Sequence, residues 1–263
     1  MDFLNKDFYT FEDLVEIMKF LRAPDGCPWD KVQTHESIRS NLIEETYEVI
    51  EAIDTKDDEL MKEELGDVLL QVVFHSEMAA EDNTFDINDV INDLCRKLVV
   101  RHPHVFGDVK ADNSDEALKS WDDVKMKTKS QRKQSEAMLS VSRALPSLMR
   151  ATKIQQKAAK VGFDWNDADE ALPKVSEELS ELKEAMGEKD EAHICEELGD
   201  LLFAVVNVSR LLKVDSEKAL YDACDKFTSR FSAVEDLAQK RGIDMKSASL
   251  NELNSLWDEV KNK

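Results

Sequence analysis

The sequence predicts an all-α protein made of two tandem helical modules. Its periodic segments are long, rich in Leu, Glu, Lys and Ala, and interrupted by only seven glycines and five prolines in 263 residues. The scarcity of turn-forming residues, and the lack of a convincing alternating β-branched run, argue against a sheet. The pentapeptide Glu-Glu-Leu-Gly-Asp also occurs twice, at residues 63–67 and 196–200. Such a repeat, in a chain long enough for two compact domains, predicts one module in each half.

The helical periodicity divides each half into four main helices. In the first half it predicts helices near residues 10–22, 36–54, 57–81 and 87–101. In the second half it predicts helices near 146–160, 168–186, 189–212 and 216–240, with a further helix near 249–260. We therefore expect domains at 1–125 and 141–263, joined by a linker at 126–140, and we expect dimerisation to complete each helical bundle.

Four carboxylates recur with identical spacing in the two halves. Glu45, Glu48, Glu64 and Asp67 reappear 133 positions later as Glu178, Glu181, Glu197 and Asp200. A spacing of three residues puts both members of a pair on one helical face. If the two helices pack side by side, all four acids converge, and like charges about 4 Å apart repel by roughly 4 kcal/mol at an effective dielectric near 20. Such a quartet should take up protons or bind a cation, and ligation by oxygen alone suits Mg²⁺ or Mn²⁺ better than Zn²⁺.

An alternative is that these acids form ordinary solvated helix faces. The residues just after each quartet argue against it. Residues 68–74 and 201–207 are apolar on nearly every side, which predicts helices buried within a bundle. Acids at the mouth of a buried helix require a partner.

The formal net charge of −21 disfavours binding to polymeric nucleic acid or to anionic membranes, which attract basic surfaces. It permits a small phosphate ligand whose charge a metal neutralises. The basic composition of segment 125–134 favours a solvated connector over a tail that binds nucleic acid. Residues 1–20 lack a signal-peptide core, and no apolar run approaches the ~20 residues of a membrane span, so we expect a cytoplasmic protein. The four cysteines have no metal or redox spacing, which favours buried or free thiols over disulfides.

Each half also contains a pair of basic residues downstream of the acids. Lys226 and Arg230 stand one helical turn apart, and Lys97 and Arg101 repeat this pair with an offset of 129 residues. Taken alone such pairs are usually surface residues, but facing a metal-bearing acidic cluster they would suit a triphosphate. Asn207, seven residues beyond Asp200, has an amide that could bind a ribose or a phosphate. The matching residue of the first half is phenylalanine, which favours the second half as the main site.

Taken together, these residues resemble the MazG-type nucleoside triphosphate pyrophosphohydrolases of the all-α NTP pyrophosphatase superfamily. The resemblance covers essentially the whole chain and includes residues 26–30, 101–107 and 161–165 besides the two pentapeptides. It implies tandem MazG-like four-helix modules and Mg²⁺-dependent hydrolysis of NTP or dNTP to NMP or dNMP and pyrophosphate. It also implies homodimers whose sites draw on more than one chain, with the C-terminal domain as the main catalytic domain.

The resemblance also assigns roles to residues. It implies that magnesium is held by Glu178, Glu181, Glu197 and Asp200. Lys226 and Arg230 would bind the phosphates, and the family's late tryptophan matches Trp257, which could lie against the base. Lys174 and Asn207 are further substrate-binding candidates, and we take Glu178 as the catalytic base. A second candidate site in the first half comprises Glu45, Glu48, Glu64, Asp67, Lys97 and Arg101.

Other interpretations remain open. His102 and His104 could form a metal pair, although the proline between them favours a turn or packing role. A di-iron carboxylate bundle normally requires Glu-x-x-His on two helices, and this chain has none. A non-enzymatic helical adaptor would use the acidic faces to bind a partner.

Overall fold

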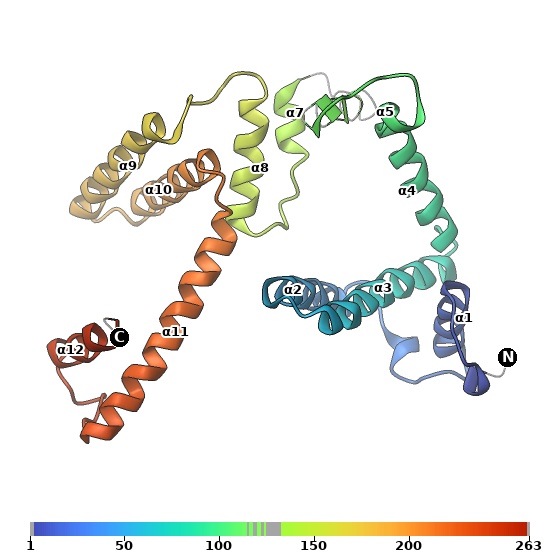
Figure 1. Ribbon diagram of the computed structural model, residues 1–263, viewed down its shortest axis with the longest axis horizontal. Coiled ribbons are helices and arrows are strands. Elements are labelled where there is room, and N and C mark those ends of the chain that lie inside the picture. Colours follow the sequence, from blue (N-terminus) through green and yellow to red (C-terminus); the bar gives the residue numbers. More distant parts are fainter. Residues whose placement is uncertain (1–2, 115, 118–119, 122–123, 125–132, 262–263) are drawn as a thin grey trace. The chain divides into compact units, whose positions relative to one another are not determined.

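The computed structural model describes residues 3–114, 116–117, 120–121, 124 and 133–261. All regular secondary structure within these ranges is helical (Figure 1). The chain divides into two compact units, Met1–Lys125 and Met126–Lys263, and each is described by itself. Most of the basic segment 125–134 lies outside the described residues. Among the helices that the structure describes, none combines the length and the apolar character that crossing a lipid bilayer requires.

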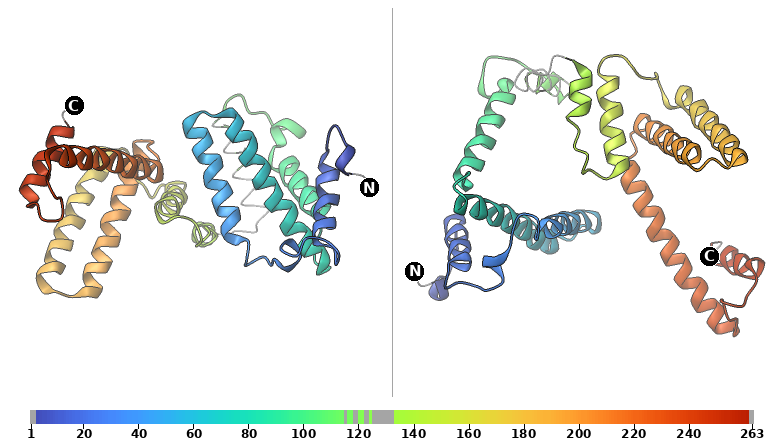
Figure 2. Two further views of the ribbon diagram at one scale, coloured as in Figure 1. Left: turned by 90° about the horizontal axis from the view of Figure 1, so that it is seen from below. Right: turned by 180° about the vertical axis from the view of Figure 1, so that it is seen from behind.

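Unit 1 is organised around a helical hairpin. Its helices are α1 (Phe11–Arg22), α2 (Arg39–Thr55), α3 (Asp58–Glu81), α4 (Ile87–Arg101) and the short α5 (Pro103–Phe106). The hairpin pairs α2 with α3, and α1 and α4 both pack on α3 (Figure 2). Thr10 and Asp13 form a capping box at the start of α1, and Asp86 and Asp89 form one at α4. These caps satisfy backbone N–H groups that a helix start leaves free.

The core of unit 1 forms where α1 and α4 meet the second half of α3. Its buried side chains are Met18, Ile38, Val73, Phe74, Met78 and Ile87. This core lies beyond the acidic residues of α3, and α3 also pairs with α2. The core therefore anchors the second half of α3, whereas the acidic residues near the start of α3 lie outside the core.

Unit 2 repeats the hairpin and adds two terminal helices. Its helices are α7 (Gln134–Leu139), α8 (Ser147–Ala159), α9 (Ala168–Glu188), α10 (Glu191–Leu211), α11 (Ser216–Arg241) and α12 (Leu250–Lys261). The hairpin pairs α9 with α10, α8 packs on α10, and α12 packs on α11 (Figure 1). Val234, Ala238 and Leu256 form a core between α11 and α12.

The two hairpins turn in the same way. α2 ends at Lys56 with a φ of 57°, and α9 ends at Lys189 with a φ of 59°. The next residue, Asp57 or Asp190, accepts two backbone N–H groups at the start of the following helix. The left-handed residue reverses the chain and the aspartate caps the new helix, so the 133-residue repeat of the sequence is also a repeat of backbone structure.

The structure confirms the nine predicted helices, with ends that differ by three residues or fewer. It adds α5 and α7, which are too short to show helical periodicity. α7 falls within the segment expected to be a linker and packs on α8. All four cysteines are free thiols, as predicted.

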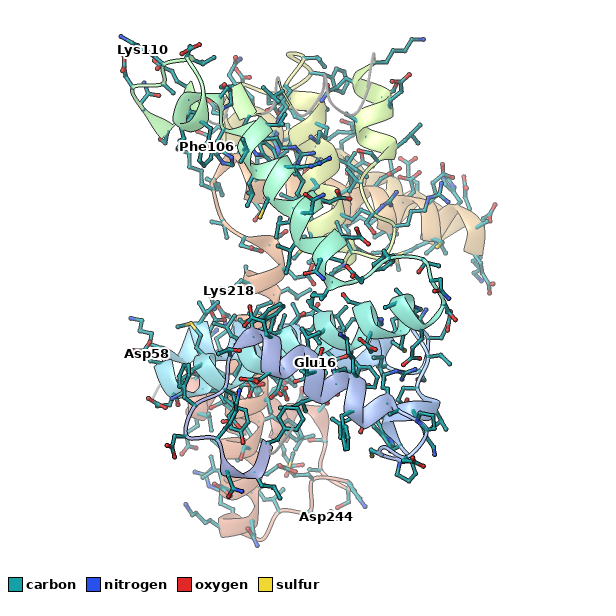
Figure 3. All side chains as sticks on the ribbon, turned by 90° about the vertical axis from the view of Figure 1, so that its right-hand side faces the viewer. Glu16, Asp58, Phe106, Lys110, Lys218 and Asp244 are labelled. Carbon is teal, nitrogen blue, oxygen red and sulfur yellow. The ribbon has the colours of Figure 1, made fainter. Side chains whose placement is uncertain are left out.

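Charged side chains such as Asp58, Lys110 and Asp244 are exposed at the edges of the units (Figure 3). Large apolar side chains are exposed as well, among them Leu198, Leu202, Phe203 and Phe227. The most extensive helix packing lies within the α2–α3 and α9–α10 hairpins, and these hairpins keep apolar surface that their units do not cover.

Candidate active site

Three carboxylates converge on the α9–α10 hairpin of unit 2. One oxygen each from Glu178 on α9 and from Glu197 and Asp200 on α10 lie within 4.8 Å of one another. Glu178 is only 5 % exposed, Glu197 is half-buried and Asp200 is exposed. The hairpin thus brings together acids that lie up to 22 residues apart in the sequence, at a point where one is shielded from water and one is open to it.

The fourth predicted acid, Glu181, lies beside this group. Partial burial raises the pKa of Glu181 above its ordinary value, and a hydrogen bond with Glu178 and the charges of Glu178 and Glu197 raise it further. The structure therefore places Glu181 against Glu178, outside the three closest ligand atoms.

Two basic side chains contact these acids. Lys174 Nζ lies 2.6 Å from Glu178 Oε1 and 2.9 Å from Glu177 Oε1, and hydrogen bonds to the two carboxylates raise the pKa of Lys174. His193 Nε2 lies 3.2 Å from Glu197 Oε1, and its pKa is raised, first by a hydrogen bond to Glu188. Lys174 was predicted and His193 was not, although its spacing of four residues from Glu197 could have indicated it.

A cavity of about 180 Å³ opens beside the acids. Its walls include Trp165, Ala171, Lys174, Glu178, Asp200, Phe203, Ala204 and Asn207. Ala171 and Ala204 are small, which leaves space between the two helices. Asn207 is 6 % exposed and lies on the same helix as Asp200, so the cavity leads from the carboxylates to a buried amide.

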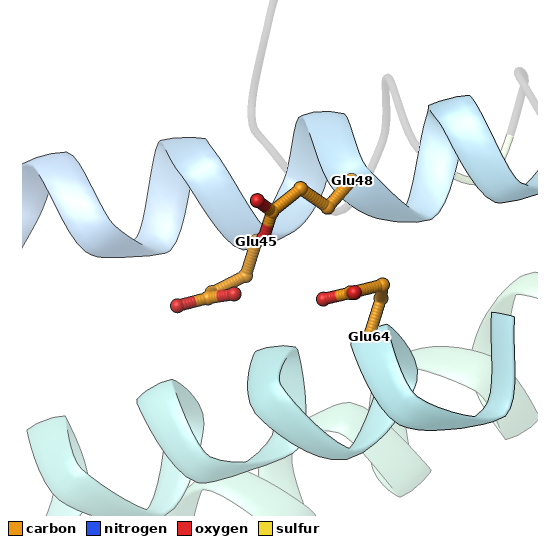
Figure 4. Close-up of side chains that lie close together, drawn as sticks. All are labelled: Glu45, Glu48 and Glu64. Atoms are coloured by element: carbon orange, nitrogen blue, oxygen red, sulfur yellow. The ribbon is translucent and has the colours of Figure 1, made fainter. Parts of the chain in front are cut away.

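The α2–α3 hairpin of unit 1 holds a comparable acidic group. Oxygens of Glu45, Glu48 and Glu64 lie within 4.8 Å of one another (Figure 4). Burial is the main cause of a raised pKa at Glu45 and at Glu64, and the neighbouring carboxylates, including Asp67, add to it. The first module therefore also gathers acids that repel one another.

Three predicted phosphate- or base-binding residues lie elsewhere in unit 2. Lys226 and Arg230 are on α11, which leads away from the α9–α10 hairpin toward α12 (Figure 1). Trp257 packs against Phe227 with ring centroids 5.1 Å apart. None of the three lines the cavity, and among the described residues no ion pair joins the two cations to the acids.

The corresponding cations of unit 1 behave similarly. Lys97 is exposed on α4, and the guanidinium of Arg101 lies over the Trp121 ring, 5.4 Å from its centroid. The described part of the chain shows no ion pair between either residue and the acids of unit 1. His102 and His104 lie with ring centroids 5.6 Å apart, and His102 Nδ1 contacts the Leu98 carbonyl oxygen at 2.6 Å, a packing arrangement.

The repeated acidic hairpin matches a known protein family. The model of the MazG nucleotide pyrophosphohydrolase domain matches residues 33–106 and 167–234, which together make up more than half of the chain. The chain belongs to the MazG nucleotide pyrophosphohydrolase family. Both acid quartets lie inside the matched MazG segments, as do Lys226 and Arg230, whereas Trp165 and Trp257 lie outside them.

Relatives extend the match over nearly the whole chain. The nucleoside triphosphate pyrophosphohydrolase/pyrophosphatase MazG of Thermotoga maritima is 49 % identical over 251 residues, which cover 95 % of each chain. The nucleoside triphosphate pyrophosphohydrolase of Escherichia coli K12 is 44 % identical over 251 residues, 94 % of this chain and 95 % of its own. YabN of Bacillus subtilis, an uncharacterized protein, is 45 % identical over 257 residues, 97 % of this chain and 52 % of its own.

Proposed function

We propose that unit 2 hydrolyses nucleoside triphosphates, ribo or deoxy, to the monophosphate and pyrophosphate with a bound divalent cation, Mg²⁺ or Mn²⁺. The observation that carries this proposal is the convergence of Glu178, Glu197 and Asp200 within 4.8 Å of one another, beside a cavity that Glu178 and Asp200 line. Membership of the MazG family and the names of the relatives support the reaction type.

The donor set fits a hard divalent cation. The converging ligand atoms are all carboxylate oxygens, the ligands that Mg²⁺ and Mn²⁺ prefer. The ion pair of Lys174 with Glu178 indicates that the acids attract positive charge. We infer that Glu178, Glu181, Glu197 and Asp200 hold the metal, which when bound would neutralise phosphate charge and lower the pKa of a bound water.

The residues of the chain can perform the remaining steps. Glu178 is buried and lies at the cavity wall, so its carboxylate can accept the proton of the attacking water. Lys174 Nζ lies 2.6 Å from Glu178 Oε1, which holds the carboxylate of the proposed base in place. Lys174 also lines the cavity, which supports a contact between its ammonium group and a phosphate oxygen.

We further infer that the site is completed in a homodimer. Lys226, Arg230 and Trp257 lie on the α11–α12 segment, away from the cavity of their own unit. The hairpin and α11 both expose large apolar side chains, including Leu202, Phe203 and Phe227, which a second subunit would cover. A partner's α11 could then supply the two cations to the triphosphate and the tryptophan to the base.

The α2–α3 hairpin is a second, metal-binding candidate. Its support is the group Glu45, Glu48 and Glu64, with Asp67 close enough to raise the pKa of two of them. Titration of the full-length Glu178→Gln/Asp200→Asn variant with Mg²⁺ and Mn²⁺ should show uptake that Glu45→Gln/Glu64→Gln abolishes. If the Glu178→Gln/Asp200→Asn variant binds neither Mg²⁺ nor Mn²⁺, this second site is refuted.

The direct test of the reaction is a product analysis. The protein is incubated with a panel of NTPs and dNTPs plus Mg²⁺, and the products are resolved. Formation of NMP and pyrophosphate supports the proposal, whereas NDP with orthophosphate indicates another phosphohydrolase. Hydrolysis that survives Glu178→Gln and Asp200→Asn unchanged would instead favour a helical adaptor with a contaminating activity.

A further inference from the structure

We propose that Arg210 is a positioning residue that turns the side-chain amide of Asn207, so that its NH₂ group faces the cavity and donates to an acceptor oxygen of the bound nucleotide. This inference rests on the proposed function. It assigns a role to a residue outside the acidic quartet and defines what Asn207 can recognise.

The orientation of the amide follows from the chemistry of its neighbour. Asn207 and Arg210 lie three residues apart on α10, and Arg210 Nε and Nη2 lie 3.0 Å and 2.7 Å from Asn207 Oδ1. A guanidinium has only donors, so the atom that it contacts must be the amide oxygen. The nitrogen, Nδ2, therefore occupies the other position of the amide, because only that assignment pairs the donors of Arg210 with an acceptor.

A second anchor holds Arg210 in place. Its Nη2 also donates to Asp164 Oδ1, and the same oxygen accepts the backbone N–H of Trp165 at 3.0 Å. The Arg210 side chain is only 12 % exposed, so these charge-assisted hydrogen bonds are largely shielded from water. Trp165 and Asn207 both line the cavity, and Arg210 therefore ties together the two walls that they form.

The remaining donor of Asn207 has no partner within the described chain. No hydrogen bond from Nδ2 occurs there, while the residue is 6 % exposed and borders the cavity. Nδ2 is not among the fully buried side-chain atoms that lack a partner in the described chain, so it stays open to the cavity, where a ligand oxygen can accept its hydrogen bond. Asn207 Nδ2 therefore selects a ligand group that accepts a hydrogen bond, and both the sugar and the phosphates of a nucleotide offer one.

Unit 1 cannot form this arrangement. The residues that match Asn207 and Arg210 there, 133 positions earlier, are Phe74 and Glu77, which offer neither the amide nor the guanidinium. The Asn207–Arg210 pair therefore occurs only in the second module, whereas both modules have the acidic residues.

The decisive variant is Asn207→Asp, because it keeps an oxygen for Arg210 while replacing the cavity-facing NH₂ by an acceptor. Binding of an Mg²⁺–α,β-methylene NTP, which cannot be cleaved between the α and β phosphorus atoms, is measured by calorimetry. We expect Asn207→Asp to raise its Kd about 3- to 10-fold, the size of one hydrogen bond, without lowering Tm. Asn207→Leu, which adds no charge, should raise Kd by a similar factor.

Arg210 is tested through a double-mutant cycle. Arg210→Gln should raise Kd like Asn207→Leu, and the double variant should bind no more weakly than the weaker single variant, since both remove the same contact. Arg241→Gln removes another arginine–carboxylate pair of unit 2, with Glu259 at 2.7 Å, and serves as the matched control with unchanged Kd. Additive losses, or an Asn207→Asp variant that binds like the wild type, would overturn the inference.

The same series separates this inference from the proposed function. A wild-type protein that neither binds the analogue nor releases pyrophosphate refutes the function itself. With an active wild type, 2′-deoxy and 3′-deoxy analogues identify the acceptor. The Asn207→Leu penalty disappears for an analogue that lacks the contacted hydroxyl, and persists with both if a phosphate oxygen is contacted.

Discussion

The two hairpins of this protein share their acids but differ in the side chains that come after those acids along the helix. Beyond Glu64, α3 carries Gln71 and Phe74, whose exposed fractions are 6 % and 3 %. At the matching positions α10 carries Ala204 and Asn207, and a cavity of about 180 Å³ opens there. The repeated acidic motif therefore gathers carboxylates in both hairpins, while the side chains one or two turns further along the helix are large and buried in unit 1 and border a cavity in unit 2.

The difference arises from side chains and not from the backbone. The connectors Lys56–Asp57 and Lys189–Asp190 have the same left-handed residue and the same cap. In unit 1 the Phe74 ring lies edge-on to Trp29, with centroids 6.5 Å apart, and under the guanidinium of Arg22 at 5.3 Å. The position that faces the cavity in unit 2 thus belongs to the core of unit 1.

The largest effect should come from removing the proposed base in one hairpin and its counterpart in the other. We expect Glu178→Gln to lower kcat about 10²- to 10⁴-fold, the usual contribution of a general base. Glu45→Gln should keep most of the activity, because the first hairpin is filled where the second is open. Steady-state release of pyrophosphate measures both, and equal losses would contradict the assignment of unit 2 as the main site.

The composite site gives a complementation test. Glu178→Gln and Arg230→Ala should each inactivate the homodimer, since one lacks the base and the other a phosphate ligand. After mixing and subunit exchange, half of the dimers are hybrids with one intact site of two, so activity should recover to about a quarter of the wild-type value. Mixtures of Glu178→Gln with Glu181→Gln, both on the same helix, are the control and should stay inactive. Persistent inactivity of the first mixture would argue that each site uses one chain.

Stability should respond more strongly in the filled hairpin. Phe74→Ala removes a buried ring and should lower the free energy of unfolding of unit 1 by about 3–5 kcal/mol. Asn207→Ala removes fewer atoms and borders an existing cavity, so its cost should be smaller, about 1–2 kcal/mol for the hydrogen bonds that it leaves unmade. Urea unfolding of the two variants, followed by tryptophan fluorescence and far-UV circular dichroism, compares them. A larger loss for Asn207→Ala would contradict the packing difference.

The sequence was sufficient to predict the two hairpins, but it was insufficient to predict the residues that contact them from elsewhere in the chain. Acids at a fixed 133-residue offset and long helical periodicities predicted α2, α3, α9 and α10, because local spacing determines a helical face. The contact of Lys174 with Glu178 follows from the same rule at a spacing of four residues. Local spacing could not predict that Arg210 meets Asp164, 46 residues away, because that contact depends on how the loop before α9 returns to α10. It also could not place α11, whose path depends on tertiary packing.

The smallest expected effect concerns a histidine pair that only unit 1 contains. His35 Nδ1 and His75 Nδ1 lie 2.8 Å apart, and the matching residues of unit 2 are Ala168 and Val208. This contact requires one nitrogen with a proton and one without, so a second proton would set two donors against each other. Burial, followed by the charge of His35, lowers the pKa of His75 below its ordinary value of 6.5.

Because the folded pKa of His75 lies below the unfolded one, the unfolded state binds more protons as the pH falls through about 6.5, and unit 1 should lose stability there. The loss is complete only below the folded pKa, and it is absent at pH 8, where both states are neutral. His75→Asn should therefore flatten the dependence of Tm on pH between pH 8 and 5.5, whereas Val208→Ala in unit 2 should shift Tm by the same amount at both pH values. A wild-type Tm whose pH dependence is unchanged by His75→Asn would show that the titration lies in the acidic groups that both hairpins share.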